Sequence, residues 1–229
     1  MKFGVVIFPG SNCDHDMIYV LKNIMQQEVV KLWHKHTDLQ SCDFIMLPGG
    51  FSFGDYLRSG AIARFSPIME EVIKFAHKGG YVMGVCNGFQ ILCESGLLPG
   101  ALLHNNNQKF VCKNVFIKAE TNNSLITATL EKGKPLSIPV AHGEGRYFAP
   151  DNIMEDLLAN DNILFKYCNE KGEETEDANP NGALLNIAGI CNQKRNVFGM
   201  MPHPERAADD VLRNTDGKLI FESVLNQFK

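Results

Sequence analysis

A cysteine between two glycines is the feature of this sequence with the clearest chemical use. Cys86 lies in Gly-Val-Cys-Asn-Gly, directly after the apolar run Tyr81–Val85. This spacing matches the G-x-S-x-G nucleophile elbow, with cysteine in place of serine: a strand turns sharply into a helix, and small residues at Gly84 and Gly88 avoid a clash across the turn. The positive end of the helix favours a thiolate, and the amide of Asn87 points toward any oxyanion formed there. We therefore predict a nucleophile at Cys86; the alternative is a buried structural thiol at a glycine-rich turn.

A thiol nucleophile in acyl transfer needs a base, and the base needs a group that orients it. The segment Met201–Arg206, Met-Pro-His-Pro-Glu-Arg, contains both kinds of residue. Prolines favour an extended backbone before them, and residues two apart in an extended segment point the same way. We therefore expect Glu205 to bond the ring nitrogen of His203 that is not offered to Cys86. The alternative is an ordinary packing or surface histidine.

Two glycine-rich segments could complete such a site. In Gly49–Asp55, Gly-Gly-Phe-Ser-Phe-Gly-Asp, backbone amides could supply a second oxyanion donor, although a simple turn is an equal alternative. In Ala141–Arg146, Ala-His-Gly-Glu-Gly-Arg, alternating glycines allow a ligand to approach the backbone closely. His142 and Glu144 have no evident third metal ligand, so no metal site is predicted.

Composition excludes several classes of protein. The 229 residues are 45% hydrophobic, enough for a sizeable core, and the formal net charge of -4 with scattered basic residues predicts neither a nucleic-acid nor a membrane partner. No apolar run approaches the ~20 residues of a membrane span, and the run at Phe3–Phe8 is too short for a signal peptide. The seven cysteines are odd in number and include no C-x-x-C, which argues against disulfides and structural zinc. We expect a cytoplasmic protein.

The first half of the chain alternates strands and helices, which predicts a mostly parallel central sheet flanked by helices in three layers. The predicted strands are Phe3–Phe8, Val29–Trp33, Phe44–Leu47 and Tyr81–Val85, and the predicted helices are Asp14–Gln27 and Pro67–His77. Glycine-rich loops follow three of these strands. Because ligand sites in such sheets lie outside the carboxyl ends of the strands, we expect these loops together at one edge.

The second half is richer in strands, which predicts additional antiparallel strands. The predicted strands are Cys112–Lys118, Leu125–Leu130, Leu136–Val140 and Ile163–Cys168, followed by a hairpin of Leu184–Cys191 and Val197–Met201. The predicted helices are Asp151–Ala159 and Gly217–Phe228, and the polar segment Asn169–Asn181 predicts a surface loop. No repeat or linker is evident, so we predict an α/β fold with one domain over residues 1–229.

Taken together, these motifs resemble a known enzyme family. Gly-Val-Cys-Asn-Gly-Phe-Gln followed by His-Pro-Glu resembles the class I (triad-type) glutamine amidotransferases, most of which carry leucine after the cysteine. This chain has Asn87 at that position, and in this it resembles the separate-chain glutaminases of phosphoribosylformylglycinamidine synthase. The same resemblance extends over nearly the whole chain, through the segments Phe8–Asp14, Pro48–Tyr56, Ala141–Arg146 and Met201–Arg206. It implies a flavodoxin-like class I glutamine amidotransferase domain.

The resemblance also implies roles for individual residues. Cys86 would attack the side-chain amide of L-glutamine, and His203, oriented by Glu205, would protonate the departing ammonia and then activate water against the glutamyl thioester. The oxyanion would be held by amides near Gly50 and at Asn87. The residues that the resemblance assigns to the oxyanion and glutamine sites are Gly50, Phe51, Asn87, Gln90, His142 and Gly143.

The family delivers ammonia to a second chain, and the resemblance implies the same partner here. A large synthetase subunit would use ATP and Mg²⁺ to convert formylglycinamide ribonucleotide to formylglycinamidine ribonucleotide in purine biosynthesis, together with a small accessory subunit. No cofactor is expected on this chain, and its sequence contains no G-x-x-x-x-G-K-[ST] phosphate loop.

Two other functions are open from the residues alone: a free-standing cysteine hydrolase on a similar fold, and a non-catalytic binding module. The presence of Cys86, His203 and Glu205 argues against the module. Asp55–Arg58 and His142–Arg146 argue against the hydrolase, because without a partner they could only form a solvated charged face. We expect a glutamine-like electrophile to label Cys86 and to leave two other thiols untouched, namely Cys13 and Cys93.

Overall fold

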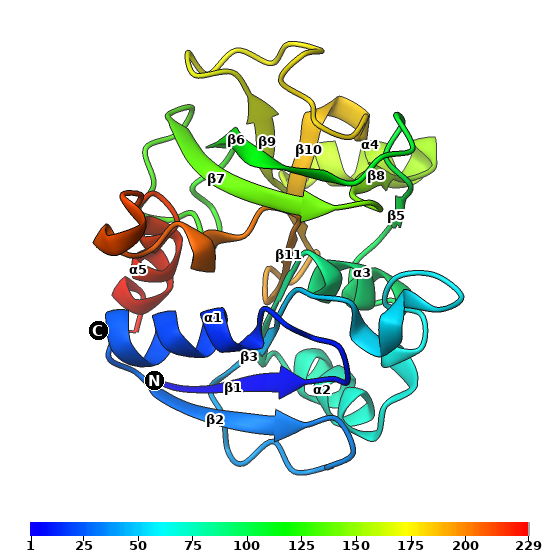
Figure 1. Cartoon of the computed structure of the whole chain (residues 1–229), viewed down its shortest axis with the longest axis vertical. Helices are drawn as coiled ribbons and strands as arrows, with labels where there is room; N and C mark the ends of the chain where they lie inside the picture. Colours follow the sequence, from blue (N-terminus) through cyan, green and yellow to red (C-terminus); the bar gives the residue numbers. More distant parts are fainter. Residues whose placement is uncertain (229) are drawn as a thin grey trace.

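A nine-stranded sheet forms the centre of the protein, whose computed structural model describes residues 1–228 (Figure 1). Its strand order is β2-β1-β3-β4-β11-β10-β9-β6-β7. The first five strands in this order run parallel: β2 (Glu28–Trp33), β1 (Lys2–Ile7), β3 (Phe44–Leu47), β4 (Tyr81–Val85) and β11 (Val197–Met200). All residues of β3 and β11 are buried, as expected for parallel strands covered on both faces. The predicted parallel sheet is confirmed.

The remaining strands of the sheet pair antiparallel, which confirms the predicted change in the second half. They are β10 (Ile187–Cys191), β9 (Ile163–Cys168), β6 (Val111–Ala119) and β7 (Pro135–His142). In the predicted hairpin, Gly189 pairs with Met200. A separate two-stranded sheet joins β5 (Ala101–Leu103) to β8 (Arg146–Phe148). Strands this short show no periodic pattern, so the sequence does not predict them.

The helices lie close to their predicted positions. The α-helices are α1 (Asp14–Tyr19), α2 (Pro67–His77), α3 (Asn87–Glu94), α4 (Asp151–Ala159) and α5 (Lys218–Asn226). A π-helical segment, η1 (Val20–Ile24), continues α1. The 3-10 turns are η2 (Ser52–Asp55), η3 (Ala63–Phe65), η4 (Leu184–Asn186), η5 (Pro204–Arg206) and η6 (Asp210–Leu212). α1 packs on β1, α2 on β4, and α3 on β3, β4 and β11.

The strand predicted at Leu125–Leu130 is wrong. Thr127 N donates to Ser124 O at 3.0 Å and Leu130 N donates to Thr127 O at 3.0 Å, so the segment forms turns. The Asn122 side-chain amide donates to the carbonyl oxygens of Thr127 and Leu130, which therefore need no partner strand. The apolar residues here pack into the core, and burial alone does not distinguish a packed turn from a strand.

Two predicted elements also have different bounds from those expected. The strand predicted from Leu184 begins only at Ile187, because Leu185 and Asn186 have positive φ values of 49° and 56° and cannot continue a strand. The helix predicted over Asp14–Gln27 ends at Ile24, and Gln26 has a φ of 55°.

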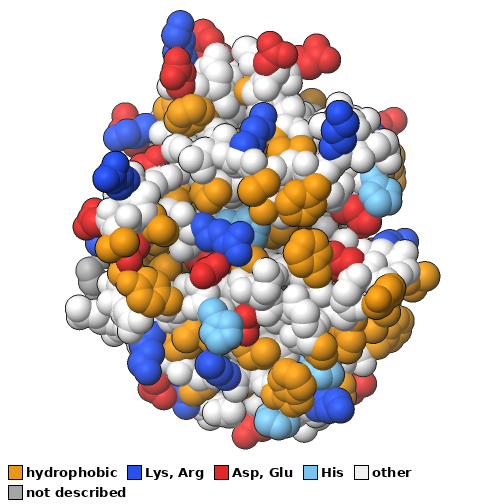
Figure 2. All heavy atoms as spheres, in the orientation of Figure 1, with side chains coloured by type: hydrophobic (Ala, Val, Ile, Leu, Met, Phe, Trp, Pro, Cys, Tyr) orange, Lys and Arg blue, Asp and Glu red, His pale blue; other side chains and the backbone are white. Residues whose placement is uncertain are grey.

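The face of the protein drawn in Figure 2 shows no large field of one charge. Figure 2 shows basic and acidic side chains interspersed across the viewed face. Hydrophobic side chains gather at the edge where the segment between β3 and α2 lies in Figure 1. In the part of the chain that the structure describes, no helix is long and apolar enough to cross a membrane.

Candidate active site

Cys86 lies at the sharp turn between β4 and α3. Its backbone has φ 51° and ψ -107°, a strained conformation for a residue other than glycine. A Cβ atom on Gly84 would lie 2.5 Å from the carbonyl oxygen of Gly88, and one on Gly88 would overlap the carbonyl oxygen of Leu47. Both glycines are therefore required by packing, and the predicted nucleophile elbow is confirmed as a structure.

The three glycine-rich loops meet at the carboxyl ends of the parallel strands, as predicted. Phe51 N donates to Gly10 O at 3.0 Å, and Cys13 N donates to Gly49 O at 3.3 Å. Gly49 lies between the reactive groups: a Cβ atom there would be 2.6 Å from Cε1 of His203 and 3.3 Å from Cβ of Cys86. The loop after β3 therefore passes directly beside the thiol and the imidazole.

His203 and Glu205 form a buried pair beside Cys86. Nδ1 of His203 lies 2.7 Å from Oε1 of Glu205, and the two residues are 1% and 2% exposed. The backbone here is not extended, contrary to prediction. Pro204 begins a 3-10 turn, which its fixed φ permits, and Arg206 N donates to His203 O at 3.1 Å. The side chains meet through this turn instead.

Electrostatics favour a protonated imidazole at this position. Burial alone would lower the pKa of His203, but the carboxylate of Glu205 and the sulfur of Cys86 outweigh it and hold the pKa well above its usual value. Within residues 1–228, Nε2 of His203 has no hydrogen-bond partner. The sulfur of Cys86 lies 3.7 Å from Ala141 O. A protonated nitrogen that is not bonded to protein can pass its proton to a bound ligand.

Two backbone amides near Cys86 are free to bind an oxyanion. Asn87 is the first residue of α3, where amides have no acceptor within the helix. Gly50, at φ 131°, has an amide with no acceptor in the described part of the chain. Phe51 differs from the expectation, because its amide already donates to Gly10 O. The two free amides are thus those of Gly50 and Asn87.

The side chain of Asn87 connects α3 to the loop after β3. Its Oδ1 accepts a hydrogen bond from Ser52 N at 3.1 Å. Its Nδ2 donates to Oδ1 of Asp55 at 3.1 Å and to Oε1 of Gln90 at 2.8 Å. A leucine here could make none of these bonds, so Asn87 fixes the position of the loop that carries Gly50.

Gln90 extends this connection to the Ala141–Arg146 loop. Its Nε2 donates to Glu144 O at 2.6 Å, and Ser59 N donates to Oε2 of Glu144 at 3.2 Å. Burial, together with the nearby carboxylate of Glu144, raises the pKa of Asp55 despite hydrogen bonds from Ser59 and Asn87. The side chain of Gln90 is therefore already bonded to protein and acts in this structure as a connector between loops.

His142 is held by two asparagines that the sequence does not identify as site residues. Its Nδ1 lies 3.2 Å from Oδ1 of Asn105, and its Nε2 lies 3.5 Å from Nδ2 of Asn181. Asn105 also accepts from Gly145 N at 3.0 Å, and Asn181 donates to Gly145 O at 2.9 Å. Asn181 is fully buried although it ends the predicted surface loop. Neither asparagine belongs to a periodic pattern, so only the tertiary fold identifies them.

His142 and Gly143 have different surroundings. Burial, and then the nearby His203, lower the pKa of His142 to about 4, so its ring is neutral near pH 7. A Cβ atom on Gly145 would overlap that ring. Gly143 instead faces open space, because a Cβ atom there would have Cδ2 of Phe110 as its nearest neighbour, at 3.8 Å. Of these residues, Gly143 is therefore the one that a ligand can approach.

Cys13 lies inside the site, although the sequence offers no reason to place it there. Its sulfur would lie 3.3 Å from a Cβ atom on Gly49 and accepts a hydrogen bond from Nη2 of Arg206 at 3.1 Å. Cys93, by contrast, lies on α3 with its sulfur 3.9 Å from Pro99 O, and burial raises its pKa. Cys13, which we expect a glutamine-like electrophile to leave untouched, therefore lies within the site, whereas Cys93 lies on α3 outside it.

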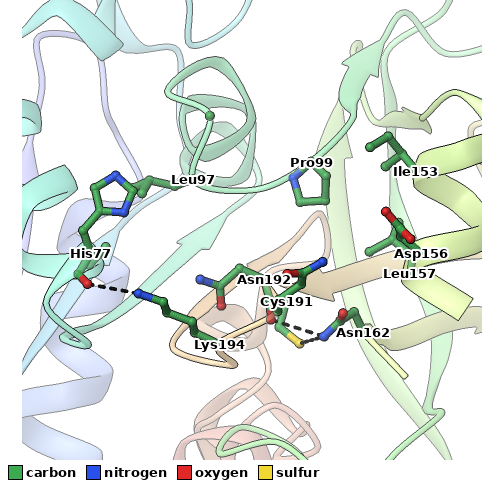
Figure 3. Close-up of a pocket in the computed structure, with 13 residues that line it drawn as sticks. His77, Leu97, Pro99, Ile153, Asp156, Leu157, Asn162, Cys191, Asn192 and Lys194 are labelled. Atoms are coloured by element: carbon green, nitrogen blue, oxygen red, sulfur yellow. Dashed lines mark hydrogen bonds between the residues drawn. The ribbon is translucent and has the colours of Figure 1, made fainter. Parts of the chain in front are cut away.

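A separate pocket of about 320 Å³ lies at the opposite edge of the sheet (Figure 3). Figure 3 shows side chains from the end of α2, the segment after α3, α4 and the turn after β10 pointing toward it. The parallel strands β4 and β11 begin at this edge, whereas Cys86 lies beyond the end of β4. Its lining includes His77, Leu97, Pro99, Leu157, Asn162 and Cys191. This pocket is therefore not part of the candidate site.

Comparisons with known proteins agree with this geometry. The family described as "CobB/CobQ-like glutamine amidotransferase domain" matches residues 1–223. A protein of Koribacter versatilis named "Phosphoribosylformylglycinamidine synthase subunit PurQ" is 57% identical over 98% of this chain and 97% of its own length. The protein of the same name from Aquifex aeolicus is 52% identical over 99% of this chain and 100% of its own.

Solved structures give the same result. A chain of the Thermotoga maritima structure titled "Structure of PurLQS" has a TM-score of 0.88 and 42% identity, and the match covers 100% of this chain and 99% of that one. A glutamine amidotransferase of the same organism has a TM-score of 0.56 at 15% identity, covering 99% of this chain and 91% of that one, and shows a shared fold alone.

Proposed function

This chain belongs to the glutamine amidotransferase family, and within it to the PurQ subunits of phosphoribosylformylglycinamidine synthase, and on that premise we propose how its residues act. It is the glutaminase subunit of that synthase, an enzyme of purine biosynthesis. One observation carries the assignment of the site. A strained cysteine on a strand–helix turn lies beside a buried His203–Glu205 pair whose members are 2.7 Å apart.

In the first half of the reaction, the thiolate of Cys86 attacks the side-chain carboxamide carbon of glutamine. The tetrahedral oxyanion accepts hydrogen bonds from the amides of Gly50 and Asn87. His203 donates its Nε2 proton to the departing nitrogen, and ammonia leaves a glutamyl thioester on Cys86. Glu205 holds Nδ1 and stabilises the imidazolium before the proton is transferred.

In the second half, neutral His203 removes a proton from water, and the resulting hydroxide attacks the thioester carbon. The C–S bond then breaks, glutamate is released, and the thiolate–imidazolium pair is restored. His142 remains neutral and holds its own loop, so it takes no part in proton transfer. Gly143 supplies backbone that the substrate can approach.

The ammonia goes to a synthetase subunit, and we place ATP and Mg²⁺ on that partner, with no cofactor on this chain. A small accessory subunit completes the proposed assembly. The loop after β3 supports a partnered protein: Tyr56 and Leu57 are 75% and 90% exposed, while neighbouring Asp55 is bonded to Asn87 within the site. A free-standing hydrolase has no use for this arrangement, and the comparisons do not favour it.

We also propose a single domain and a cytoplasmic location. Strands from both halves of the chain share one sheet, since β11 lies between β4 and β10, which supports one domain. The last residue of the predicted range 1–229 lies outside the described residues. The seven cysteines are free thiols, which supports a reducing compartment.

The test is ammonia release from glutamine, measured for this chain alone and then with a synthetase subunit, formylglycinamide ribonucleotide and ATP. We expect low activity alone and strong stimulation in the complex. Cys93→Ala, which removes a thiol seven residues away on α3, is the matched control and should be stimulated to the same extent. Equal activity with and without the partner would contradict delivery of ammonia to a second chain.

A further inference from the structure

The nucleophile of the proposed reaction is almost completely covered in this structure. Cys86 is 4% exposed and His203 is 1% exposed, yet glutamine must bring its carboxamide carbon into contact with the sulfur of Cys86. Part of the surrounding structure must therefore move before the substrate can bind. A group that covers the thiol and moves at low cost would control access to the site.

Two loops flank the thiol. On one side, a Cβ atom on Gly49 would lie 3.3 Å from Cβ of Cys86, and Phe51 follows two residues later. On the other side, the carbonyl oxygen of Ala141 lies 3.7 Å from the sulfur of Cys86, and Gly143 follows two residues later. A ligand that enters between the two loops therefore passes Phe51 and Gly143.

An aromatic pair spans the gap between these loops. The ring centroids of Phe51 and Phe110 lie 6.3 Å apart with an interplanar angle of 28°, which is a stacked arrangement. Cδ2 of Phe110 is also the nearest neighbour of a Cβ atom built on Gly143, at 3.8 Å. The ring of Phe110 thus lies against both flanks of the site, against Gly143 on one and Phe51 on the other.

The two rings can separate without a change in the backbone that carries them. Phe51 N donates to Gly10 O at 3.0 Å, and Phe51 O accepts from Gly54 N at 2.8 Å. Val111, the residue after Phe110, already belongs to β6. Phe51 and Phe110 are 47% and 54% exposed, so a change of rotamer moves either ring into solvent and leaves the core intact.

We propose that Phe110, stacked on Phe51, closes the entrance of the glutamine site, and that the two rings separate to admit glutamine to Cys86. This inference rests on the proposed function and adds to it a residue that controls access of the substrate. Stacking of two aromatic rings favours the closed arrangement by about 2- to 12-fold. Because only the open arrangement binds glutamine, the apparent affinity for glutamine falls with the fraction of closed molecules.

Access is measured first, as the rate at which iodoacetamide alkylates Cys86 in the isolated chain, with the modified thiol identified by mass spectrometry. Phe110→Ala should be alkylated about 2- to 12-fold faster, whereas Phe110→Tyr keeps the stacked ring and should react at the unaltered rate. Phe148→Ala, which removes a 45% exposed ring on β8, is the matched control and should also react at the unaltered rate. No acceleration in Phe110→Ala would overturn the inference.

A loosened fold would also accelerate alkylation, so a second thiol serves as an internal reference. Cys191 lies on β10 with 0% of its surface exposed, and its alkylation requires a wider opening of the fold. Its rate should be the same in Phe110→Ala and in the unaltered chain. A parallel increase at Cys191 and Cys86 would assign the effect to lost stability and refute the role of Phe110 at the entrance.

Substrate use is measured second, as ammonia release by the isolated chain at varied glutamine concentration. In Phe110→Ala, KM for glutamine should fall by about the factor by which alkylation rises, while kcat stays near its unaltered value. A lower kcat at an unchanged KM would place Phe110 in the chemical step and overturn its role in access. Alkylation requires no glutaminase activity, so failure of this inference is distinguishable from failure of the proposed function.

Discussion

Replacing Asn87 by leucine tests whether the side chain next to the nucleophile positions the oxyanion site. The substitution introduces the residue that the wider class carries at this position. It leaves the backbone amide of residue 87 in place but removes the acceptor of Ser52 N at 3.1 Å and the donors to Asp55 and Gln90 at 3.1 and 2.8 Å. Any loss of activity must then come from displacement of the loop that carries Gly50.

The expected loss of stability in Asn87→Leu depends on which hydrogen-bond partners of the Asn87 side chain stay buried without a replacement. Ser52 is buried, and its amide has no second acceptor among the described residues. Loss of its hydrogen bond to Asn87 therefore costs about 1–3 kcal/mol. Asp55 is partly exposed, and Gln90 keeps its hydrogen bond to Glu144. Loss of the hydrogen bonds from Asn87 to these two residues therefore costs less. We expect a decrease of about 2–4 kcal/mol in the free energy of unfolding.

The kinetic effect should fall mainly on kcat. Removing one oxyanion donor outright costs about 10²–10³ in kcat, and a donor that is displaced rather than removed should cost about 10- to 100-fold. Urea denaturation and ammonia release at varied glutamine concentration measure the two quantities. Asn152→Leu, at an exposed position on α4, is the control and should change neither. An Asn87→Leu protein as stable and active as the unaltered chain would refute the positioning role.

The other predictions concern the base and its surroundings. Glu205→Gln keeps an acceptor for Nδ1 of His203 but removes the charge. Since a charge-assisted hydrogen bond is worth about 1.5–3 kcal/mol, kcat/KM for glutamine should fall about 10- to 150-fold, and an unchanged value would contradict the orienting role. The same pair predicts a pH dependence of stability. Because the folded pKa of His203 is raised, its contribution is complete below the unfolded pKa of about 6.5 and is lost as pH rises through the folded pKa. Urea denaturation between about pH 6 and pH 9 should show this decline in the unaltered chain and a weaker one in Glu205→Gln, and parallel curves would argue against the raised pKa. Gly49→Ala places a methyl group 2.6 Å from Cε1 of His203. A displacement of about 1 Å should cost about 10²-fold in activity, while alkylation of Cys86 persists, and full activity would show that this contact is not required.

Sequence alone predicts those parts of the site that depend on neighbouring residues. Gly84, Cys86 and Gly88 satisfy a steric requirement within one turn, so their spacing is sufficient to identify the elbow. His203 and Glu205 meet within one turn as well, although the turn is 3-10 and not extended. The buried parallel strands can also be predicted, because strands covered on both faces have short continuous apolar sequences.

Residues that reach the site from distant segments could not be predicted. Asn105 and Asn181 meet around His142 only because β6, β7 and β9 lie together in the sheet, and Cys13 meets Arg206 across 193 positions of sequence. The error at Leu125–Leu130 has a related cause. A turn that satisfies its carbonyls through the Asn122 side chain buries apolar residues in the same way as a strand.

The central claim is that Cys86 takes ammonia from glutamine for use on another chain. The most direct test is formation of formylglycinamidine ribonucleotide by the complex that contains Cys86→Ala, supplied either with glutamine or with ammonium chloride. We predict that synthesis from glutamine is abolished, because no thioester can form, and that synthesis from added ammonia remains near the unaltered rate. Loss of both activities would mean that Cys86 is structural, and retention of the glutamine-dependent activity would mean that the nucleophile is another residue.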